Sequence, residues 1–315
     1  MNKIKQFLFR VMENNLNLIT KIGISKNIPG VMPIYNFLFK SSWPYGDIIE
    51  IQGSKMFVGI KDASPSLRKT FEAYALNKIH EEITTELFKN VLKEGDVFID
   101  LGANIGYFSL LASRLVGKKG KVFSFEPEPT NFSCLKKNLE INNYRQARSF
   151  LKAVSDKNGK IKLFVCDYDT GHHTINQYEG IKSYSRGRST VEKEIEIDAV
   201  TLDSFLGDKT DRVDVIKMDV EGAEMLALIG MDKVLRDNMD IKMFIEFFPL
   251  LIKEMGSSPE EFIRRLLEDY KFSVFIIPND YNASAGEMVK INSVSDVMSL
   301  IKAEDDHINM FLKRG

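Results

Sequence analysis

VFIDLGANIGYFSLLA, residues 97–112, predicts a buried strand that turns through glycines into a helix. Its first three residues are apolar and partly β-branched, as in a central parallel strand covered on both faces. Asp100 then ends the predicted strand, and Gly102 and Gly106 permit a tight turn and a close backbone approach to a ligand. Because open α/β sheets bind ligands at the carboxyl ends of their strands, a ligand pocket is expected at Asp100.

The chemistry of this turn indicates what the ligand is. Its spacing, Asp-x-Gly-x-x-x-Gly, differs from the Gly-x-Gly-x-x-Gly of a dinucleotide site. Asp100 would repel a phosphate, but it could accept hydrogen bonds from an ammonium group. Glu126 lies where a βαβ unit places an acid that receives the two hydroxyls of a ribose. A nucleoside joined to an amino acid satisfies both ends, which points to S-adenosylmethionine.

Composition excludes several classes of protein. The chain has 315 residues, of which 44% are hydrophobic, so it can bury a sizeable core. Its net charge of −1 gives no general attraction to nucleic acid, and no nucleic-acid partner is expected. Cys134 and Cys166 have no paired spacing, so neither a disulfide framework nor a cysteine metal site is predicted. A cytoplasmic location fits best, and the sequence leaves the oligomeric state open.

The N-terminal segment carries an apolar stripe rather than a signal peptide, because Arg10 and Glu13 interrupt its apolar core. No segment approaches the roughly 18 uncharged apolar residues of a transmembrane helix. The stripe could pack on its own domain or on a partner subunit, or it could make a peripheral contact with a membrane surface. Its residues are Ile4, Phe7, Leu8, Val11 and Met12.

The periodicity of the chain predicts an N-terminal extension over residues 1–75 and one α/β domain over residues 76–315. Short strands are expected at 48–51 and 56–60 in the extension. Within the domain, strands are expected at 121–125, 150–154, 160–166, 192–200, 213–218, 241–245, 272–277 and 308–313, the last in a hairpin with its neighbour. Helices are expected at 76–92, 130–142, 223–235, 258–270 and 293–302. The polar segment 167–190 is predicted to be a substrate lid, although a polar loop without function would have the same composition.

Acidic residues end five of the predicted strands or follow them closely. A single acid in this position is usually a helix cap or a turn former, but parallel strands bring their carboxyl ends to one edge of the sheet. Five acids at one edge favour a binding site. They are Asp100, Glu126, Asp156, Asp219 and Glu246.

Five motifs taken in order resemble the FkbM family of S-adenosylmethionine-dependent methyltransferases. They are FIDLGANIGYFS, FEP at 125–127, AVSDKNG at 153–159, TLDSF at 201–205 and IKMDVEGAE at 216–224. The resemblance covers roughly residues 79–249 and implies a class I methyltransferase fold. This is a Rossmann-like, mostly parallel sheet of seven strands with one antiparallel strand. It also implies O-methylation, commonly of sugar or polyketide hydroxyls.

The resemblance implies roles for individual residues. Cofactor binding carries over onto Asp100, Gly102, Asn104, Gly106, Glu126 and Asp219. Ser155 and Asp156 are candidates for the adenine side, which Pro127 would flank, and Glu81 and Thr85 are candidates for the methionine end.

Methyl transfer from a sulfonium requires the methyl group to be aligned with the acceptor oxygen. A base that takes the hydroxyl proton accelerates the transfer. The candidates for that base are Glu221, Glu246 and His173, with His80 and His172 as further histidines. Each also has a structural interpretation, such as a helix N-terminal acid for Glu221. Asp219, Glu221 and Glu246 could alternatively hold a divalent cation that orients a diol.

Two other functions stay open from the sequence. A catalytically silent cofactor-binding protein could act as a scaffold at membrane glycan machinery, recruited by the N-terminal helix. An NAD-dependent oxidoreductase is disfavoured, because the dinucleotide glycines are missing and Asp100 stands in their place.

Overall fold

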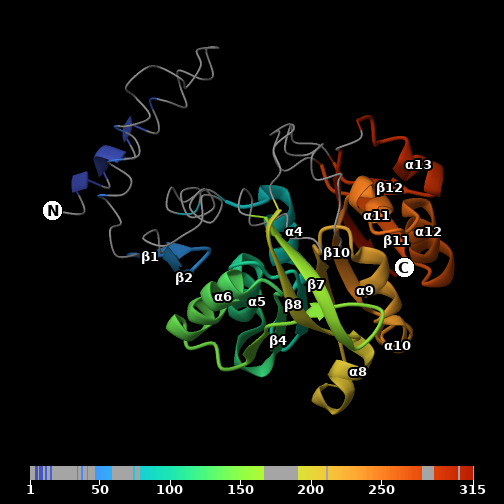
Figure 1. Cartoon of the computed structure of the whole chain (residues 1–315), viewed down its shortest axis with the longest axis horizontal. Helices are drawn as coiled ribbons and strands as arrows, with labels where there is room; N and C mark the ends of the chain where they lie inside the picture. Colours follow the sequence, from blue (N-terminus) through green and yellow to red (C-terminus); the bar gives the residue numbers. More distant parts are fainter. Residues whose placement is uncertain are drawn as a thin grey trace. The chain divides into compact units, whose positions relative to one another are not determined.

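Eight strands form one mixed sheet at the centre of the α/β part of the chain (Figure 1). Six of them run in one direction, namely β11, β10, β9, β3, β4 and β5, whereas β13 is antiparallel to both of its neighbours and β12 is antiparallel to β11 at the edge. The order across the sheet is β12 (Val289–Ile291), β11 (Ser273–Ile276), β13 (Ile308–Lys313), β10 (Lys242–Phe247), β9 (Val215–Met218), β3 (Val97–Leu101), β4 (Lys121–Phe125) and β5 (Ala147–Phe150).

The structure is a computed structural model that describes residues 47–58, 79–166, 191–210, 212–278, 287–303 and 306–314, with residue 74 and scattered positions before 47. The chain divides into one unit of residues 1–51 and 55–78 and another of residues 52–54 and 79–315. The predicted lid, 167–190, lies outside the described residues, as do His172 and His173.

The predicted α/β methyltransferase fold class is confirmed. The sheet has one strand more than the seven expected, because β12 adds to the outer edge of β11. The last strand, β13, is inserted between β10 and β11 and makes the expected antiparallel pairing.

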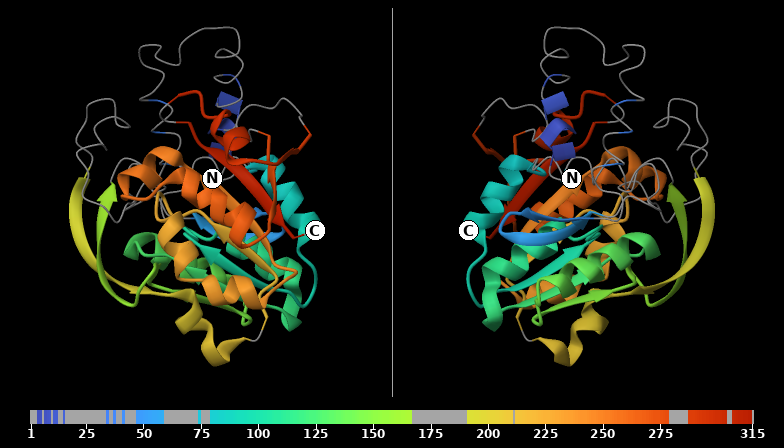
Figure 2. Two further views of the ribbon diagram at one scale, coloured as in Figure 1. Left: turned by 90° about the vertical axis from the view of Figure 1, so that its right-hand side faces the viewer. Right: turned by 90° about the vertical axis from the view of Figure 1, so that its left-hand side faces the viewer.

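Helices lie on both sides of the sheet (Figure 2), because its strands are apolar on both faces. The helices before and between the first parallel strands are α4 (Glu82–Val91), α5 (Tyr107–Val116) and α6 (Pro129–Ile141). The later helices are α8 (Leu202–Leu206), α9 (Glu224–Ile229), α10 (Asp232–Asp237), α11 (Pro249–Glu254), α12 (Pro259–Arg264) and α13 (Val294–Met298). A π-helical turn, Arg265–Asp269, extends α12.

Alternation along the strands separates the two faces. Ile99 and Leu101 of β3 pack in the larger core with residues of α9 to α12. Phe98 points to the opposite face, where its ring contacts Phe88 of α4 at 5.1 Å between centroids. Asp100 shares that second face, since side chains two positions apart on a strand project to the same side. The face covered by α4 and α5 therefore carries the polar residues of the central strands.

The predicted strand 150–154 is wrong, because the chain leaves the main sheet in the middle of it. β5 ends at Phe150, and the next two strand residues, β6 (Ala153–Val154), belong to a separate three-stranded sheet. In that sheet β6 pairs with β8 (Val191–Val200), and β8 pairs antiparallel with β7 (Gly159–Cys166). Figure 2 shows β7 and β8 as a long curved arm beside the main sheet.

Three predicted helices are also shorter than expected, and the one predicted at 293–302 is α13, which ends at Met298. The helix expected over 223–235 is divided at Gly230, whose backbone packs so closely on Ser155 that a Cβ would lie 2.0 Å from the carbonyl oxygen. A new helix, α10, then begins with its amide groups capped by Asp203, which accepts hydrogen bonds from the backbone of Lys233 and Val234. The helix expected over 76–92 begins only at Glu82, after Glu81 in a left-handed conformation with φ 42°.

Two strands of the predicted extension are present as β1 (Asp47–Ile51) and β2 (Ser54–Val58). Near the N-terminus, the described positions of the apolar stripe are helical, and Ile4, Phe7, Leu8 and Val11 are exposed. Within the parts of the chain that can be described, no helix has the length and apolar character needed to cross a membrane.

The turn after β3 makes the closest contact between two strand ends. Gly102 has φ +80°, and a Cβ added to it would lie 1.8 Å from the carbonyl oxygen of Asp219. The amide of Asp219 donates in turn to the carbonyl of Leu101 at 3.0 Å. In the direction of a side chain, Gly102 therefore faces protein backbone, and its role in ligand binding stays a prediction. Gly106 is similar, since a Cβ there would lie 2.7 Å from Leu135.

We expect Gly102→Ala to lower the free energy of unfolding much more than Gly95→Ala. Both glycines have positive φ, at +80° and +89°, so each substitution carries about 1–2 kcal/mol of backbone strain. Gly95 has open space around it, whereas at Gly102 the new methyl group collides with the Asp219 backbone, which adds about 1–3 kcal/mol. Urea unfolding of both variants measures the difference. Equal losses would show that the contact with Asp219 is unimportant.

Candidate functional site

The pairing register and the two-residue repeat of the strands bring polar residues of three strands onto one face of the sheet. Lys217 of β9 is paired with Asp100 of β3 on one side and with Phe244 of β10 on the other. Asp219 lies two residues beyond Lys217, and Glu246 lies two residues beyond Phe244. Both are therefore on the same face of the sheet as Lys217. The predicted gathering of acids at the strand ends is therefore real for Asp100, Asp219 and Glu246.

Asp100 is a buried strand residue rather than the end of its strand. It is 1% exposed and accepts a hydrogen bond of 2.5 Å from the hydroxyl of Ser109, which also contacts Ser124 at 2.7 Å. Burial raises its pKa to about 6, against the opposing effects of Lys217 and the Ser109 hydroxyl. Asp100 is thus anchored from α5 and is charged above that pKa.

Lys217 is the main residue of the site that the sequence analysis missed. Its ammonium group lies 2.8 Å from Asp219 Oδ2 and 4.8 Å from the centre of the Phe108 ring, and the side chain is buried. Burial alone would lower the pKa of Lys217, but the carboxylates of Asp219, Glu81 and Asp100 outweigh it and raise the pKa. A lysine inside the apolar strand VIKM was the available signal.

Glu81 and Asp219 complete the charge group around this lysine. Burial would raise the pKa of each carboxyl, but Lys217 outweighs it, and both pKa values are lowered. Glu81 also forms an ion pair with His80, at 3.1 Å from Nε2 to Oε1. Glu81, one of the two methionine-end candidates from the sequence, is therefore held ionised beside Lys217. Thr85, the other candidate, donates its hydroxyl to the His80 carbonyl.

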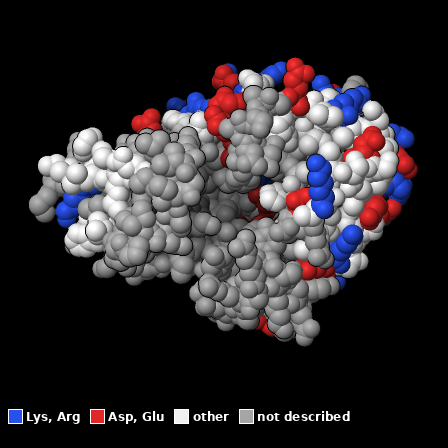
Figure 3. All heavy atoms as spheres, turned by 90° about the horizontal axis from the view of Figure 1, so that it is seen from above, with Lys and Arg blue, Asp and Glu red and all other residues white. Residues whose placement is uncertain are grey.

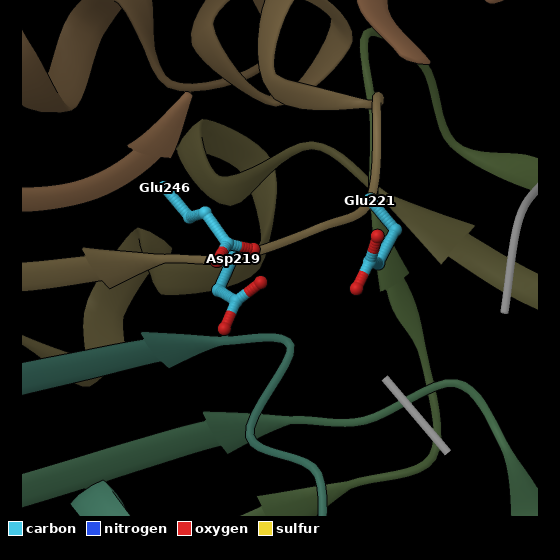
Figure 4. A group of neighbouring side chains, drawn as sticks. All are labelled: Asp219, Glu221 and Glu246. Atoms are coloured by element: carbon cyan, nitrogen blue, oxygen red, sulfur yellow. The ribbon is translucent and has the colours of Figure 1, made fainter. Parts of the chain in front are cut away.

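A second acidic group borders the first. Carboxylate oxygens of Asp219, Glu221 and Glu246 lie within 4.8 Å of one another, and Figure 4 shows them on two neighbouring strand ends and the following loop. Burial, followed by the charges of Asp219 and Glu221, raises the pKa of Glu246 well above its ordinary value. His307 lies 3.6 Å from Glu246. These three carboxylates have the donor chemistry of a divalent cation site, although Asp219 already pairs with Lys217.

Glu126 is held in one orientation by the glycine turn. It is 4% exposed, and its two oxygens accept backbone hydrogen bonds from Asn104 at 2.8 Å and from Glu128 at 2.9 Å. The Asn131 side chain makes a third hydrogen bond to this carboxylate. Three of its four acceptor sites are then used, and a fixed acceptor remains that fits a ribose hydroxyl. Burial raises the pKa of Glu126 to about 8.

The adenine-side candidates lie apart from these contacts. Ser155 and Asp156 follow β6, and the Ser155 hydroxyl donates to Asp156 at 3.0 Å while its amide donates to Val200. Pro127, directly after Glu126, is partly exposed. The roles of these three residues stay predictions.

Glu224 is a further acid that the sequence analysis did not select. It is 1% exposed, one oxygen accepts from the Gly222 amide at 3.1 Å, and the other has no hydrogen-bond partner among the described residues. Burial raises its pKa to about 8, and the nearby charges of Glu221 and Asp219 act in the same direction. Its position at the start of α9 gave no sign of this burial.

The fold and the buried carboxylates define an S-adenosylmethionine-dependent methyltransferase. Residues 100–274 match the family of the methyltransferase FkbM domain, so the chain belongs to the FkbM methyltransferase family. This membership favours an enzyme over the silent scaffold, and it overturns the oxidoreductase hypothesis.

Two fungal proteins resemble the chain in sequence. Methyltransferase 1 of Beauveria bassiana is 26% identical over 217 residues, which cover 64% of this chain and 83% of that protein. Methyltransferase sdnD of Sordaria araneosa is 30% identical over 191 residues, or 51% of this chain and 72% of that protein.

Solved structures are more distant. The methyltransferase FkbM of Methylobacillus flagellatus is 13% identical, with a TM-score of 0.39 over 78% of this chain and 53% of that one. The putative methyltransferase SMU.1697c of Streptococcus mutans, in complex with SAH, is 12% identical with the same TM-score over 76% and 99%.

We expect the affinity for S-adenosylhomocysteine to rise with pH up to about pH 8, because Glu126 is predicted to accept a hydrogen bond from the ribose when it is ionised, and burial raises its pKa in the free protein to about 8. Below that pKa the affinity should fall by at most about tenfold per pH unit. Calorimetry across this range measures it. In Glu126→Gln, any pH dependence of binding that comes from ionisation of the ligand remains. Binding to this variant should be weak and should lack the pH dependence that Glu126 causes. Wild-type affinity in that variant would contradict the expectation.

Proposed function

We propose that the protein is an O-methyltransferase that acts on a hydroxyl group of a sugar, glycan, glycolipid or secondary-metabolite precursor. The observation that carries this proposal is the position of Glu246, a partly buried carboxyl on β10 whose oxygen lies within 4.8 Å of carboxylate oxygens of Asp219 and Glu221. Burial and these neighbouring charges raise its pKa, so its ionised form is a stronger base than an exposed carboxylate. A hydroxyl acceptor needs such a base, since its proton must leave as the new bond to carbon forms.

The proposed roles of the residues follow from their chemistry. Glu126, with Asn104 in the glycine turn, would bind the ribose, and Glu81, Asp100 and Asp219 would surround the cationic methionine end. Ser155, Asp156 and Pro127 would border the adenine. The bound cofactor supplies a methyl group that is already activated by its sulfonium, so the protein mainly has to align it with the acceptor.

In the proposed reaction Glu246 receives the proton of the acceptor hydroxyl. Glu221 belongs to the same group of three carboxylates. S-adenosylmethionine, held by Glu126, Asp100 and Asp219, would supply the methyl group to the acceptor oxygen and would leave as S-adenosylhomocysteine. His173 and the segment 167–190 are proposed to close over the acceptor. This part of the proposal concerns residues outside those that the structure describes.

We expect Glu246→Gln to reduce kcat by about 10²–10⁴-fold, the usual contribution of a general base, and to leave S-adenosylhomocysteine affinity nearly unchanged. Transfer of labelled methyl groups to an extract of glycans, lipids and small metabolites from the source organism measures the rate. Glu140→Gln, on an exposed position of α6, is a matched control. Full activity of the Glu246 variant would remove this residue from the reaction. Mass spectrometry of cells with and without the gene then identifies the acceptor by the loss of one CH2.

A second candidate is metal-assisted O-methylation, which the spacing of Asp219, Glu221 and Glu246 favours. A divalent cation there would orient a diol and acidify one of its hydroxyls. Proton transfer to Glu246 alone predicts that methyl transfer is unchanged after dialysis against EDTA. Loss of activity that Mg²⁺ or Mn²⁺ restores in the wild type, but not in Glu221→Gln, would favour the metal instead.

A further inference from the structure

Lys217 is a buried cation that the proposed reaction does not use. It projects from the middle of the central sheet between Asp100 and Phe244, and its ammonium contacts Asp219 at 2.8 Å under the ring of Phe108. Burying an ammonium group is costly unless it is paired. An apolar side chain would fill the same position of the strand without that cost, so the lysine calls for a reason of its own.

The surrounding charges supply that reason. Asp100 and Glu81 are 1% and 6% exposed, and both interact electrostatically with Lys217, as does the directly paired Asp219. Three carboxylates packed in one low-dielectric region repel one another, and one ammonium group among them offsets part of this repulsion. The three carboxylates and Lys217 together retain a net negative charge. This charge suits the methionine end of the cofactor, which carries an ammonium group and a sulfonium.

We propose that Lys217 is a positioning residue of the cofactor site, which holds the Asp219 carboxylate in place for the methionine end of S-adenosylmethionine. The inference rests on the proposed placement of Asp219 at that end. Lys217 itself does not touch the cofactor. It acts through its ion pair, and its charge and reach both matter, so arginine should replace it in part and methionine should not.

A double-mutant cycle tests this role by calorimetry with S-adenosylhomocysteine, which needs no acceptor. We expect Lys217→Met to weaken binding by about tenfold or more and Lys217→Arg to restore part of the loss. In the Asp219→Asn background, Lys217→Met should cause little further loss, since the residue it acts through is already gone. Lys242→Met, at the amino end of β10, is the control and should bind normally.

Each other outcome decides against the inference. Wild-type affinity in Lys217→Met, or losses that simply add in the double variant, would leave Lys217 with a role in folding alone. Unchanged affinity in Asp219→Asn would overturn the placement of the cofactor itself, independently of the acceptor chemistry. If circular dichroism shows that Lys217→Met does not fold, Lys217→Arg replaces it in the same cycle. The loss of affinity caused by Lys217→Arg should then vanish in the Asp219→Asn background. A loss that persists in that background would overturn the inference.

Discussion

The contact between the turn after β3 and the backbone of Asp219 is the constraint on which the site depends. Gly102 leaves no room for a side chain against the Asp219 carbonyl, and the Asp219 amide extends the pairing of the two strands by one residue. This closeness brings the acids that end neighbouring strands to one place. Gly102 therefore has a structural role, because the backbone that it approaches is that of Asp219.

Around that contact, electrostatics and strand geometry act together. The two-residue repeat of a strand places Lys217 and Asp219 on one face, and the parallel register places Asp100 beside the lysine. Burial would raise the pKa of every carboxyl there, and the Lys217 ammonium group is the largest opposing effect on Asp219, Glu81 and Asp100. Asp219 and Glu81 keep their charge beside Lys217, whereas Glu246, farther along, has a raised pKa.

Basic and acidic side chains are interspersed on the described surface of the face in Figure 3, in keeping with the small net charge. The strands of the main sheet were largely predictable, because each is a short apolar run between turn residues. The predicted strand 150–154 was wrong because nothing in its local pattern shows that the chain changes sheets after Phe150. The helix over 223–235 was divided by a contact between Gly230 and Ser155, which lies outside that segment.

The sequence by itself determined the order of strands and helices, the acids at the strand ends and the FkbM motifs, because each depends on residues close together in the chain. It also indicated the nucleoside and amino-acid character of the cofactor through Asp100 and Glu126. Only the tertiary structure decided that Lys217 lies among three carboxylates, that Glu126 is oriented by the Asn104 amide, and that Glu246 faces Asp219 and Glu221. These contacts join separate segments, and their pKa effects arise from burial that no local pattern contains.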